Sequence, residues 1–357
     1  MSNTIGEKIR VTVFGQSHAP SIGAVIEGLP AGMKIDMERV RAFMARRAPG
    51  QNALSTARKE ADEPEIIAGL NEWGETCGAP LCMVIQNGDH RSKDYSKLRE
   101  LPRPGHADYT AAVKFGSAND IRGGGQFSGR LTAPICFAGA VCMQLLEKKG
   151  IRIGAHIASI ADVDDEKFIL PDDEALDLIE SHDFPVIDEA AGERMRRRIL
   201  EAKAEGDSVG GIIEVCALNV PAGLGDPMFD GMENCLARAA FGIPAVRGVE
   251  FGTGFEAARM RGSEHNDPFS MKEDGTVATK TNHHGGILGG ITSGMPIVMR
   301  VAIKPTPSIS KEQDTVSLGR HENDRLIIEG RHDPCIVHRA VPCLESIMAI
   351  AISDKIV

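Results

Sequence analysis

Four loops of this sequence combine glycine with histidine, serine or arginine, residue types that bind anions and transfer protons. They are Gly15–His18, Arg103–Asp108, Arg122–Arg130 and Arg331–Cys335. Glycine lets backbone amides approach an anion, and arginine gives two charge-assisted hydrogen bonds to a phosphate or a carboxylate. Ser128 stands at the start of an expected helix, so helix amides would point at the same place. Together the four loops predict a site for a ligand that carries several negative charges.

Three residues in these loops are candidates for proton transfer. His18 and His106 are histidines, a residue type that can move protons near neutral pH, although a loop histidine can equally be a surface or structural residue. Asp333 precedes Pro334 and could cap the last helix, a role that would not exclude catalysis. The sequence leaves both interpretations open for each residue.

Two other motifs could bind ions. Lys304–Ser308 ends an expected strand with a cation and two hydroxyls, so it is either a proline-stiffened strand exit or a second phosphate site. His283 and His284 suggest a metal, but adjacent histidines rarely bind one ion and no acidic residue stands beside them. We therefore predict no metal site.

The elements that position these loops follow from hydrophobic periodicity and from glycine. Strands are expected at Arg10–Phe14 and Ile22–Glu27, on either side of the first loop. Asp36 can cap a helix that ends in Arg46 and Arg47, where cations also suit the helix dipole. A purely structural role for these two arginines therefore remains open.

The rest of the chain mixes strands and helices. Asn87–Gly105, 161–190 and 263–285 are expected to be irregular polar stretches. Further strands are expected at Leu81–Gln86, 209–220, Val246–Phe251 and Pro296–Lys304, and helices at Ala107–Ser117, Ser128–Lys149, 188–205, 228–241 and from Pro334 to about Ser353. Because strands and helices do not alternate regularly, the pattern favours an α+β fold, and we find no linker that would divide residues 1–357 into domains. Neither a dinucleotide-binding GxGxxG motif in its proper context nor a P-loop occurs.

Composition narrows the class of protein further. The net charge is −10 and no long Lys/Arg run occurs, which argues against nucleic-acid binding. The longest apolar stretch, Leu131–Leu146, is shorter than the ~20 residues of a membrane span, so we expect a buried core helix. The eight cysteines contain no CxxC pair, and residues 1–10 do not resemble a signal peptide. These features fit a reducing, cytoplasmic setting.

Taken together, the motifs resemble those of the chorismate synthase family. The segments that carry the resemblance run in family order along nearly the whole chain: Gly15–His18, Arg103–Tyr109, the glycine-rich run to Arg130, Gly206–Gly210, Val220–Gly225, Gly286–Ile291, Lys304–Thr306, Arg331–Cys335 and Arg339–Pro342. The resemblance implies a β-α-β sandwich, with helices between two antiparallel sheets, and a homotetramer. It implies the 1,4-elimination of phosphate from 5-enolpyruvylshikimate 3-phosphate to give chorismate, with reduced FMN required although no net redox change occurs. The source of the electrons, with NADPH as one candidate, stays open.

The resemblance also implies roles for individual residues. His18 would protonate the leaving phosphate, His106 would protonate or polarise the reduced flavin, and Asp333 would assist removal of the C6 proton. The residues implied to contact substrate are Ser17, Arg47, Arg103, Ser128, Arg130 and Arg331. Those implied to contact FMN are Arg47, Gln126, Phe127, Ser128, Ala245, Gly289, Lys304, Pro305, Thr306, Pro307, Ser308 and Arg331.

The chain departs from the family pattern around the flavin. Gln16 and Ala19 replace the usual Glu and Gly, and Gln126 and Phe127 stand where an Arg and a Ser are usual. Pro244 replaces a common Asn, and Ala53 lies where some members carry a basic residue in a region implicated in nicotinamide binding. Two alternatives to the lyase therefore remain: a flavin reductase that has lost elimination, and a non-enzymatic anion-binding protein.

Overall fold

Two five-stranded antiparallel sheets enclose the central helices of the fold. The computed structural model describes the whole chain except residues 1–2, 51–53, 55–61, 89–96, 329 and 331. The first sheet has the order β1 (Thr4–Ile5), β2 (Arg10–Gly15), β3 (Ser21–Glu27), β5 (Leu81–Gln86), β4 (Glu65–Ala68). The second has the order β7 (Val163–Asp164), β6 (Arg152–Ile160), β8 (Gly211–Leu218), β14 (Ile297–Ile303), β9 (Val246–Phe251).

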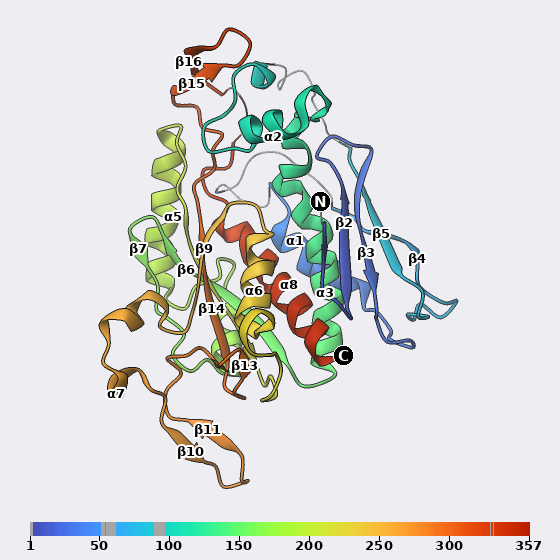
Figure 1. Cartoon of the computed structure of the whole chain (residues 1–357), viewed down its shortest axis with the longest axis vertical. Coiled ribbons are helices and arrows are strands. Elements are labelled where there is room, and N and C mark those ends of the chain that lie inside the picture. Colours follow the sequence, from blue (N-terminus) through green and yellow to red (C-terminus); the bar gives the residue numbers. More distant parts are fainter. Residues whose placement is uncertain (1–2, 51–53, 55–61, 89–96, 329, 331) are drawn as a thin grey trace.

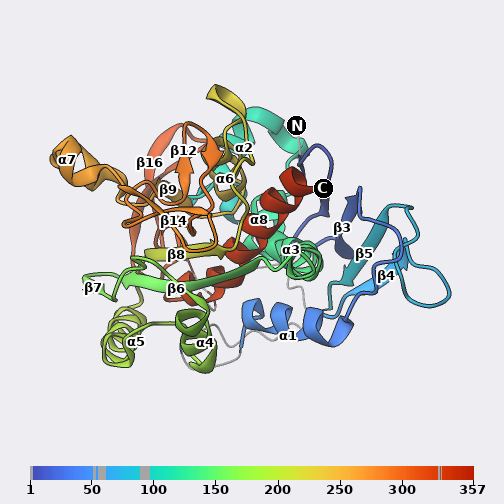
Figure 2. The same cartoon turned by 90° about the horizontal axis from the view of Figure 1, so that it is seen from below.

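The helical layer lies between these sheets. Figures 1 and 2 show α3 (Thr132–Glu147) and α8 (Val337–Ile356) in the middle of the molecule, and one hydrophobic core joins them to both sheets. Nearly every residue of α3 is buried, which is expected of a helix that is apolar on all sides. Its apolar window is long enough to cross a membrane, but 78% of that window is buried inside the fold. The expected core helix, α+β class and sandwich are thus confirmed.

Helix α1 (Met37–Arg47) begins where the sequence predicts. The Asp36 side chain accepts hydrogen bonds from the backbone amides of Glu38 and Arg39, at 3.0 and 3.1 Å. The Gln144 amide group bonds both the backbone N–H and the carbonyl of Asp36, at 2.9 and 3.0 Å. The start of α1 is therefore fixed to α3, which determines where its last residues point.

Helices α3 and α8 approach very closely at Gly139. A Cβ atom at this position would lie only 2.2 Å from Cβ of Ser346, so any side chain larger than hydrogen would force the helices apart. This contact fixes the spacing of the two helices one turn away from the active-site region.

The far end of α8 is bonded to the beginning of the chain. One carboxylate oxygen of Asp354 accepts hydrogen bonds from the backbone amides of Glu7, Lys8 and Ile9, at 2.8, 2.6 and 3.0 Å. Three amides before β2 thereby find their acceptor on α8.

The expectation of an irregular segment at 161–190 is wrong. It contains β7 and α4 (Asp173–Ser181), whose first turn is capped by Asp172. Leu176 and Ile179 of α4 pack with residues of β8 and β14 on the face of the second sheet that points away from α8. The acidic residues of this segment lie on the exposed side of α4 and obscure its short apolar spacing.

The polar stretch 263–285 is also more ordered than expected. It contains the end of α7 (Gly262–His265) and the hairpin β10 (Phe269–Met271) and β11 (Val277–Thr279), which projects from the body in Figure 1. Two more hairpins lay outside the expected strands, β12 (Ile287–Leu288) with β13 (Ile291–Thr292), and β15 (Gln313–Ser317) with β16 (Glu322–Leu326). The remaining helices are α2 (Asp108–Phe115), α5 (Glu189–Ala204), α6 (Met232–Phe241) and the 3-10 helices Gly116–Ala118, Arg122–Phe127, Gly129–Leu131, Met228–Asp230 and Gly254–Arg259.

Candidate active site

A cavity of about 660 Å³ opens where the expected loops meet. Its walls come from the end of α1, the loops before α2 and α3, the loop after α6, the exit of β14 and the start of α8. The predicted site residues that line it are Arg47, Arg103, His106, Gln126, Phe127, Ser128, Arg130, Ala245, Lys304, Thr306, Pro307, Ser308 and Asp333. Residues up to about 290 positions apart in the sequence thus share one cavity.

The charge of this cavity is strongly unbalanced. Among the described lining residues, the only carboxylate is Asp333. The cationic side chains there are Arg47, Arg103, Arg130, Arg247, Lys304 and Arg339. In a chain with a net charge of −10, this concentration of positive charge attracts a ligand with several negative charges.

His106 is held by a buried carboxylate. Its Nδ1 lies 2.6 Å from Oδ1 of Asp108, and Arg103 donates to both oxygens of the same carboxylate at 2.7 and 2.8 Å. Asp108 is the first residue of α2. A Cβ atom on Gly124 would lie 3.3 Å from Nε2 of His106, so this nitrogen faces the glycine-rich loop. With Nδ1 bonded to the carboxylate, Nε2 is the atom that can exchange a proton in the cavity.

Asp108 stays ionised at neutral pH. Burial raises the pKa of its carboxyl, but hydrogen bonds from Arg103 and His106 and the charge of Arg103 outweigh burial and hold the pKa well below its usual range. Asp108 stands in the Arg103–Asp108 loop motif, but the motif alone indicates no role for it. A carboxylate two positions after the histidine, at the start of a helix, was the available signal.

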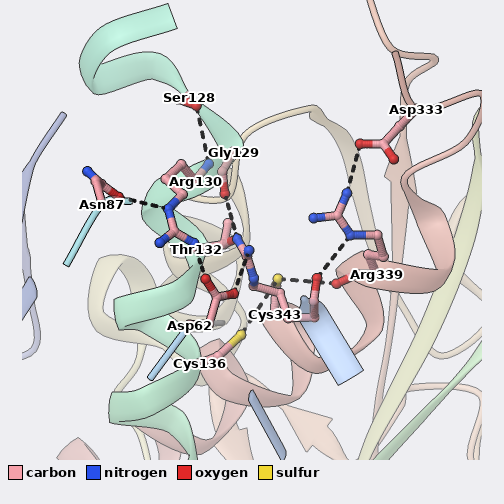
Figure 3. A network of polar contacts seen from close by, with 11 residues as sticks. Asp62, Asn87, Ser128, Gly129, Arg130, Thr132, Cys136, Asp333, Arg339 and Cys343 are labelled. Carbon is pink, nitrogen blue, oxygen red and sulfur yellow. Dashed lines mark hydrogen bonds and ion pairs between the residues drawn. The ribbon is translucent and has the colours of Figure 1, made fainter. Parts of the chain in front are cut away.

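A second buried carboxylate, Asp62, joins two of the predicted ligand-binding arginines (Figure 3). Arg47 Nη2 lies 2.7 Å from Oδ2 of Asp62, and Arg130 Nη1 bonds its other oxygen. Arg47 also donates to Thr132 Oγ1 at 3.2 Å, and Arg130 Nε donates to Asn87 Oδ1 at 3.2 Å. One buried carboxylate thus bonds two guanidinium groups of the cavity wall. No sequence motif singled out Asp62.

Asp333 does not cap the last helix. Helix α8 begins at Val337 and its N-cap residue is Ile336, so the capping alternative is wrong. Asp333 Oδ2 instead accepts from Arg339 Nη1 at 2.7 Å, and Arg339 Nε donates to the carbonyl of Arg47 at 2.9 Å (Figure 3). Arg339 therefore links Asp333 to the part of the cavity wall that Arg47 and Arg130 form, which we call the arginine wall.

The exit of β14 lies against the His106 loop. Lys304 Nζ donates to the carbonyl of Gly105, and Arg103 Nη1 donates to Ser308 Oγ at 3.2 Å. Burial and the nearby charge of Arg247 lower the pKa of Lys304. A role in binding phosphate stays a prediction, but this segment lies beside the proton-transfer loop. Pro305 does not line the cavity; it packs at Gly210.

The first loop lies immediately behind the cavity wall. Ser17 and His18 are buried and do not line the cavity, but a Cβ atom on Gly123 would lie 2.5 Å from Ser17 Oγ and 2.7 Å from His18 Nε2. The backbone amide of Ser17 bonds the carbonyl of Gly125 at 3.1 Å. Gly123 has φ +60° and lines the cavity, so glycine alone separates His18 from it.

Three sequence predictions fall elsewhere. Gly289 lies in the turn between β12 and β13 and is not among the lining residues, so its contact with FMN stays a prediction. Arg331 and Ala53 lie outside the described residues.

The paired histidines have an acidic partner that the sequence did not reveal. Asp267 Oδ2 lies 2.9 Å from Nδ1 of His284, and Asp267 Oδ1 accepts from the backbone amide of His283 at 2.8 Å. Even so, no group of three or more His, Cys, Asp or Glu side chains among the described residues is arranged to hold a metal ion.

Known proteins with similar sequences share one description. A family model described as chorismate synthase matches residues 9–357. A chorismate synthase from Korarchaeum cryptofilum is 49% identical over 351 residues, which cover 98% of this chain and 96% of that protein. One from Thermococcus gammatolerans is 48% identical over the same length and coverage. A solved structure titled "Crystal Structure of Chorismate Synthase" matches 98% of this chain and 92% of its own, with a TM-score of 0.77 and 30% identity.

Proposed function

Because the chain belongs to the chorismate synthase family, it is a lyase that eliminates phosphate from 5-enolpyruvylshikimate 3-phosphate to give chorismate, and we propose that it does so in the cavity described above with reduced FMN. The observation that carries the proposal is the cationic wall around the His106–Asp108 pair. The substrate has two carboxylates and a phosphate, and FMN adds another phosphate, so both need cations inside an acidic protein.

The residues present fit a flavin. The cavity lies within the usual size of cofactor and ligand sites, and Phe127 offers a ring that is 37% exposed. Gln126, Phe127, Ala245 and the Lys304–Ser308 segment would hold the cofactor, with Gly289 and Arg331 as further predicted contacts. The reduced flavin would supply electron density while the bond between carbon and phosphate oxygen breaks.

The protein's own residues would bind the substrate and move protons. Arg47 and Arg130, fixed by Asp62, and Arg103, fixed by Asp108, would bind the phosphate and carboxylates. The predicted contacts of Ser17 and Ser128 would orient the substrate.

Three residues would carry the protons. His18 would give a proton to the leaving phosphate, and Nε2 of His106 would donate toward the cofactor. Asp333, oriented by Arg339, would assist removal of the C6 proton.

We further propose the setting in which this reaction takes place. Residues 1–357 would form one domain, a homotetramer in the cytoplasm, with NADPH as one source of electrons. The partner would be the small-molecule substrate rather than nucleic acid or a membrane. The family match over residues 9–357, the net charge of −10 and the buried position of α3 support this view.

The test is an anaerobic assay with purified protein, chemically reduced FMN and 5-enolpyruvylshikimate 3-phosphate. Phosphate and chorismate should appear in equal amounts and only when reduced flavin is present. FMN binding by the folded protein without release of phosphate would contradict the proposal and would favour the flavin reductase alternative.

A further inference from the structure

Two thiols face each other at the floor of the active-site cavity. Sγ of Cys136, on α3, lies 3.8 Å from Sγ of Cys343, on α8 (Figure 3). Cys343 lines the cavity, whereas Cys136 is completely buried behind it. The close packing of Gly139 against Ser346, one turn further along both helices, fixes the spacing of the pair. The reaction described above uses neither thiol.

The surroundings of the two thiols differ. The hydrogen bond with Cys136 lowers the pKa of the Cys343 thiol against the effect of burial, and the charges of Arg47 and Arg339 and a hydrogen bond with Thr132 lower it further. Burial raises the pKa of Cys136. The lowered pKa favours the reactive thiolate form on Cys343, which is the member of the pair that lines the cavity.

We propose that Cys136 and Cys343 are an oxidisable dithiol that a peroxide converts to a disulfide, which reversibly inhibits the enzyme. The Cys343 thiolate attacks one oxygen of hydrogen peroxide, the O–O bond breaks, and hydroxide leaves and takes up a proton to give water. The Cys343 sulfenic acid is then attacked by Cys136, the S–O bond breaks, and a second water leaves. Two thiols and one peroxide thus give one disulfide and two waters.

The geometry needs little change for this step. A disulfide has an S–S distance of about 2.05 Å, so the two sulfur atoms must approach by roughly 2 Å. Side-chain rotation can supply much of this approach, because the helices are already in contact at Gly139. Hydrogen peroxide is small enough to enter the cavity of about 660 Å³ that Cys343 lines.

Oxidation of Cys136 and Cys343 to a disulfide would alter the position of the arginines near Cys343. Thr132 accepts from Arg47 Nη1, and the Cys343 thiol donates to the carbonyl of Arg339 at 3.6 Å. Drawing Cys343 toward Cys136 would move its sulfur relative to Arg47 and Arg339, and would thereby change the position of both guanidinium groups. Because a small displacement of a ligand-binding group weakens catalysis severely, we expect turnover to fall about tenfold.

The experiment treats the full-length wild-type protein with hydrogen peroxide and measures its intact mass, its disulfide-linked peptides and its phosphate release. We expect a mass lower by two hydrogen atoms, one linked peptide pair that contains Cys136 and Cys343, and activity that returns with a thiol reductant. An unchanged mass, or a disulfide between other cysteines, overturns the proposal. A Cys136–Cys343 disulfide with unchanged phosphate release would overturn the proposal that this disulfide inhibits the enzyme.

Variants sharpen the assignment. Cys136→Ser should stop at a sulfenic acid on Cys343 that a dimedone probe labels, whereas Cys343→Ser should give neither disulfide nor label. Cys142→Ser is the matched control, because Cys142 is a buried thiol on the same helix that does not line the cavity; it should form the disulfide like the wild type. The inhibition rests on the proposed function, but the mass and peptide measurements do not, so the two can fail separately.

Discussion

The cavity that we assign to catalysis is smaller than a second cavity that also borders α1 and α8. A cavity of about 1020 Å³ lies between α1, α3, α4 and β6, and the active-site cavity is about 660 Å³. In the larger one, cations and carboxylates are nearly equal in number among the described lining residues, and they pair: Arg39 with Glu147, Arg46 with Glu345, and Arg152 with Glu180. In the smaller one the cations greatly outnumber the carboxylates. Unbalanced charge, rather than volume, marks the ligand site.

Two consecutive residues of α1 show the same difference. Arg46 lines the larger cavity and forms two hydrogen bonds with Glu345, whereas Arg47 lines the active site and shares Asp62 with Arg130. Arg46 thus belongs to a cavity whose charges pair on its walls, and Arg47 belongs to one whose described lining is mostly cationic.

The largest expected difference in turnover between the two cavities is that between variants of His106, in the active site, and His182, in the larger cavity. His106→Ala should lower phosphate release about 10²–10⁴-fold with reduced FMN supplied, because it removes the Nε2 proton donor. His182→Ala, in the larger cavity, is the matched control and should change turnover little. Anaerobic initial rates of phosphate release measure both. Near-native turnover of His106→Ala would remove the distinction between the cavities.

The next largest difference, in substrate KM, is expected between variants of the neighbouring residues Arg47 and Arg46. Arg47→Lys keeps a charge but loses the planar guanidinium whose two Nη atoms bond Asp62 and Thr132, so we expect the substrate KM to rise about tenfold to a hundredfold. Arg46→Lys should leave KM unchanged and lower the free energy of unfolding by about 1 kcal/mol or less, because its side chain is 41% exposed. Steady-state kinetics and urea unfolding of both variants decide whether charge balance explains their roles.

Replacing Asp108 should have a smaller effect on turnover. Asp108→Asn removes the charge that holds Arg103 and His106, and we expect kcat to fall about tenfold. Because the folded pKa of Asp108 is lowered, its stabilisation is present above the ordinary carboxyl pKa of about 3.9 and is lost as the pH falls through and below that value. Acid unfolding followed by circular dichroism should therefore be less steep in Asp108→Asn. An identical acid transition would show that the carboxylate is not ionised in the fold.

The smallest effect concerns stability alone. Burial, together with the charge of Arg339, lowers the pKa of His338 to about 4. The unfolded chain therefore binds a proton below about pH 6.5 that the folded protein does not bind until about pH 4, so stability falls as the pH drops through this interval. We expect a loss of about 1–2 kcal/mol between pH 7 and pH 5. His338→Leu should abolish most of it with little change in kcat, as measured by urea unfolding at both pH values.

Elements with strong local signals were predictable from the sequence. The cap at Asp36, the uniformly apolar α3 and the strands on either side of the first loop depend on neighbouring residues, and all three are confirmed. The hairpin β10–β11 and helix α4 were missed because each is short and rich in charged or polar residues. Their order comes from contacts that a local pattern does not contain.

The active-site residues were likewise predictable only where a local sequence motif contains them. Motifs found the residues that face the cavity, such as His106 and Arg103, because glycine and proline mark those loops. Asp62, the carboxylate that bonds Arg47 and Arg130, is contacted by these residues from 15 and 68 positions away in the sequence. No short sequence motif contains the three residues together, so the role of Asp62 could not be predicted. The capping alternative for Asp333 was wrong for a similar reason: its partner, Arg339, lies beyond the irregular turn that precedes α8.

The bond between Asp354 and the amides of residues 7–9 has a consequence for biosynthesis. Helix α8 follows both sheets in the chain and packs on β6 and β8 of the second one, so while a ribosome is making residues 1–336 that sheet lacks this helix, and three amides near the start of the chain lack their acceptor. Contacts between residues this far apart make folding slow and leave apolar surface exposed in the meantime. We therefore expect the sandwich to close only after α8 has left the ribosomal exit tunnel.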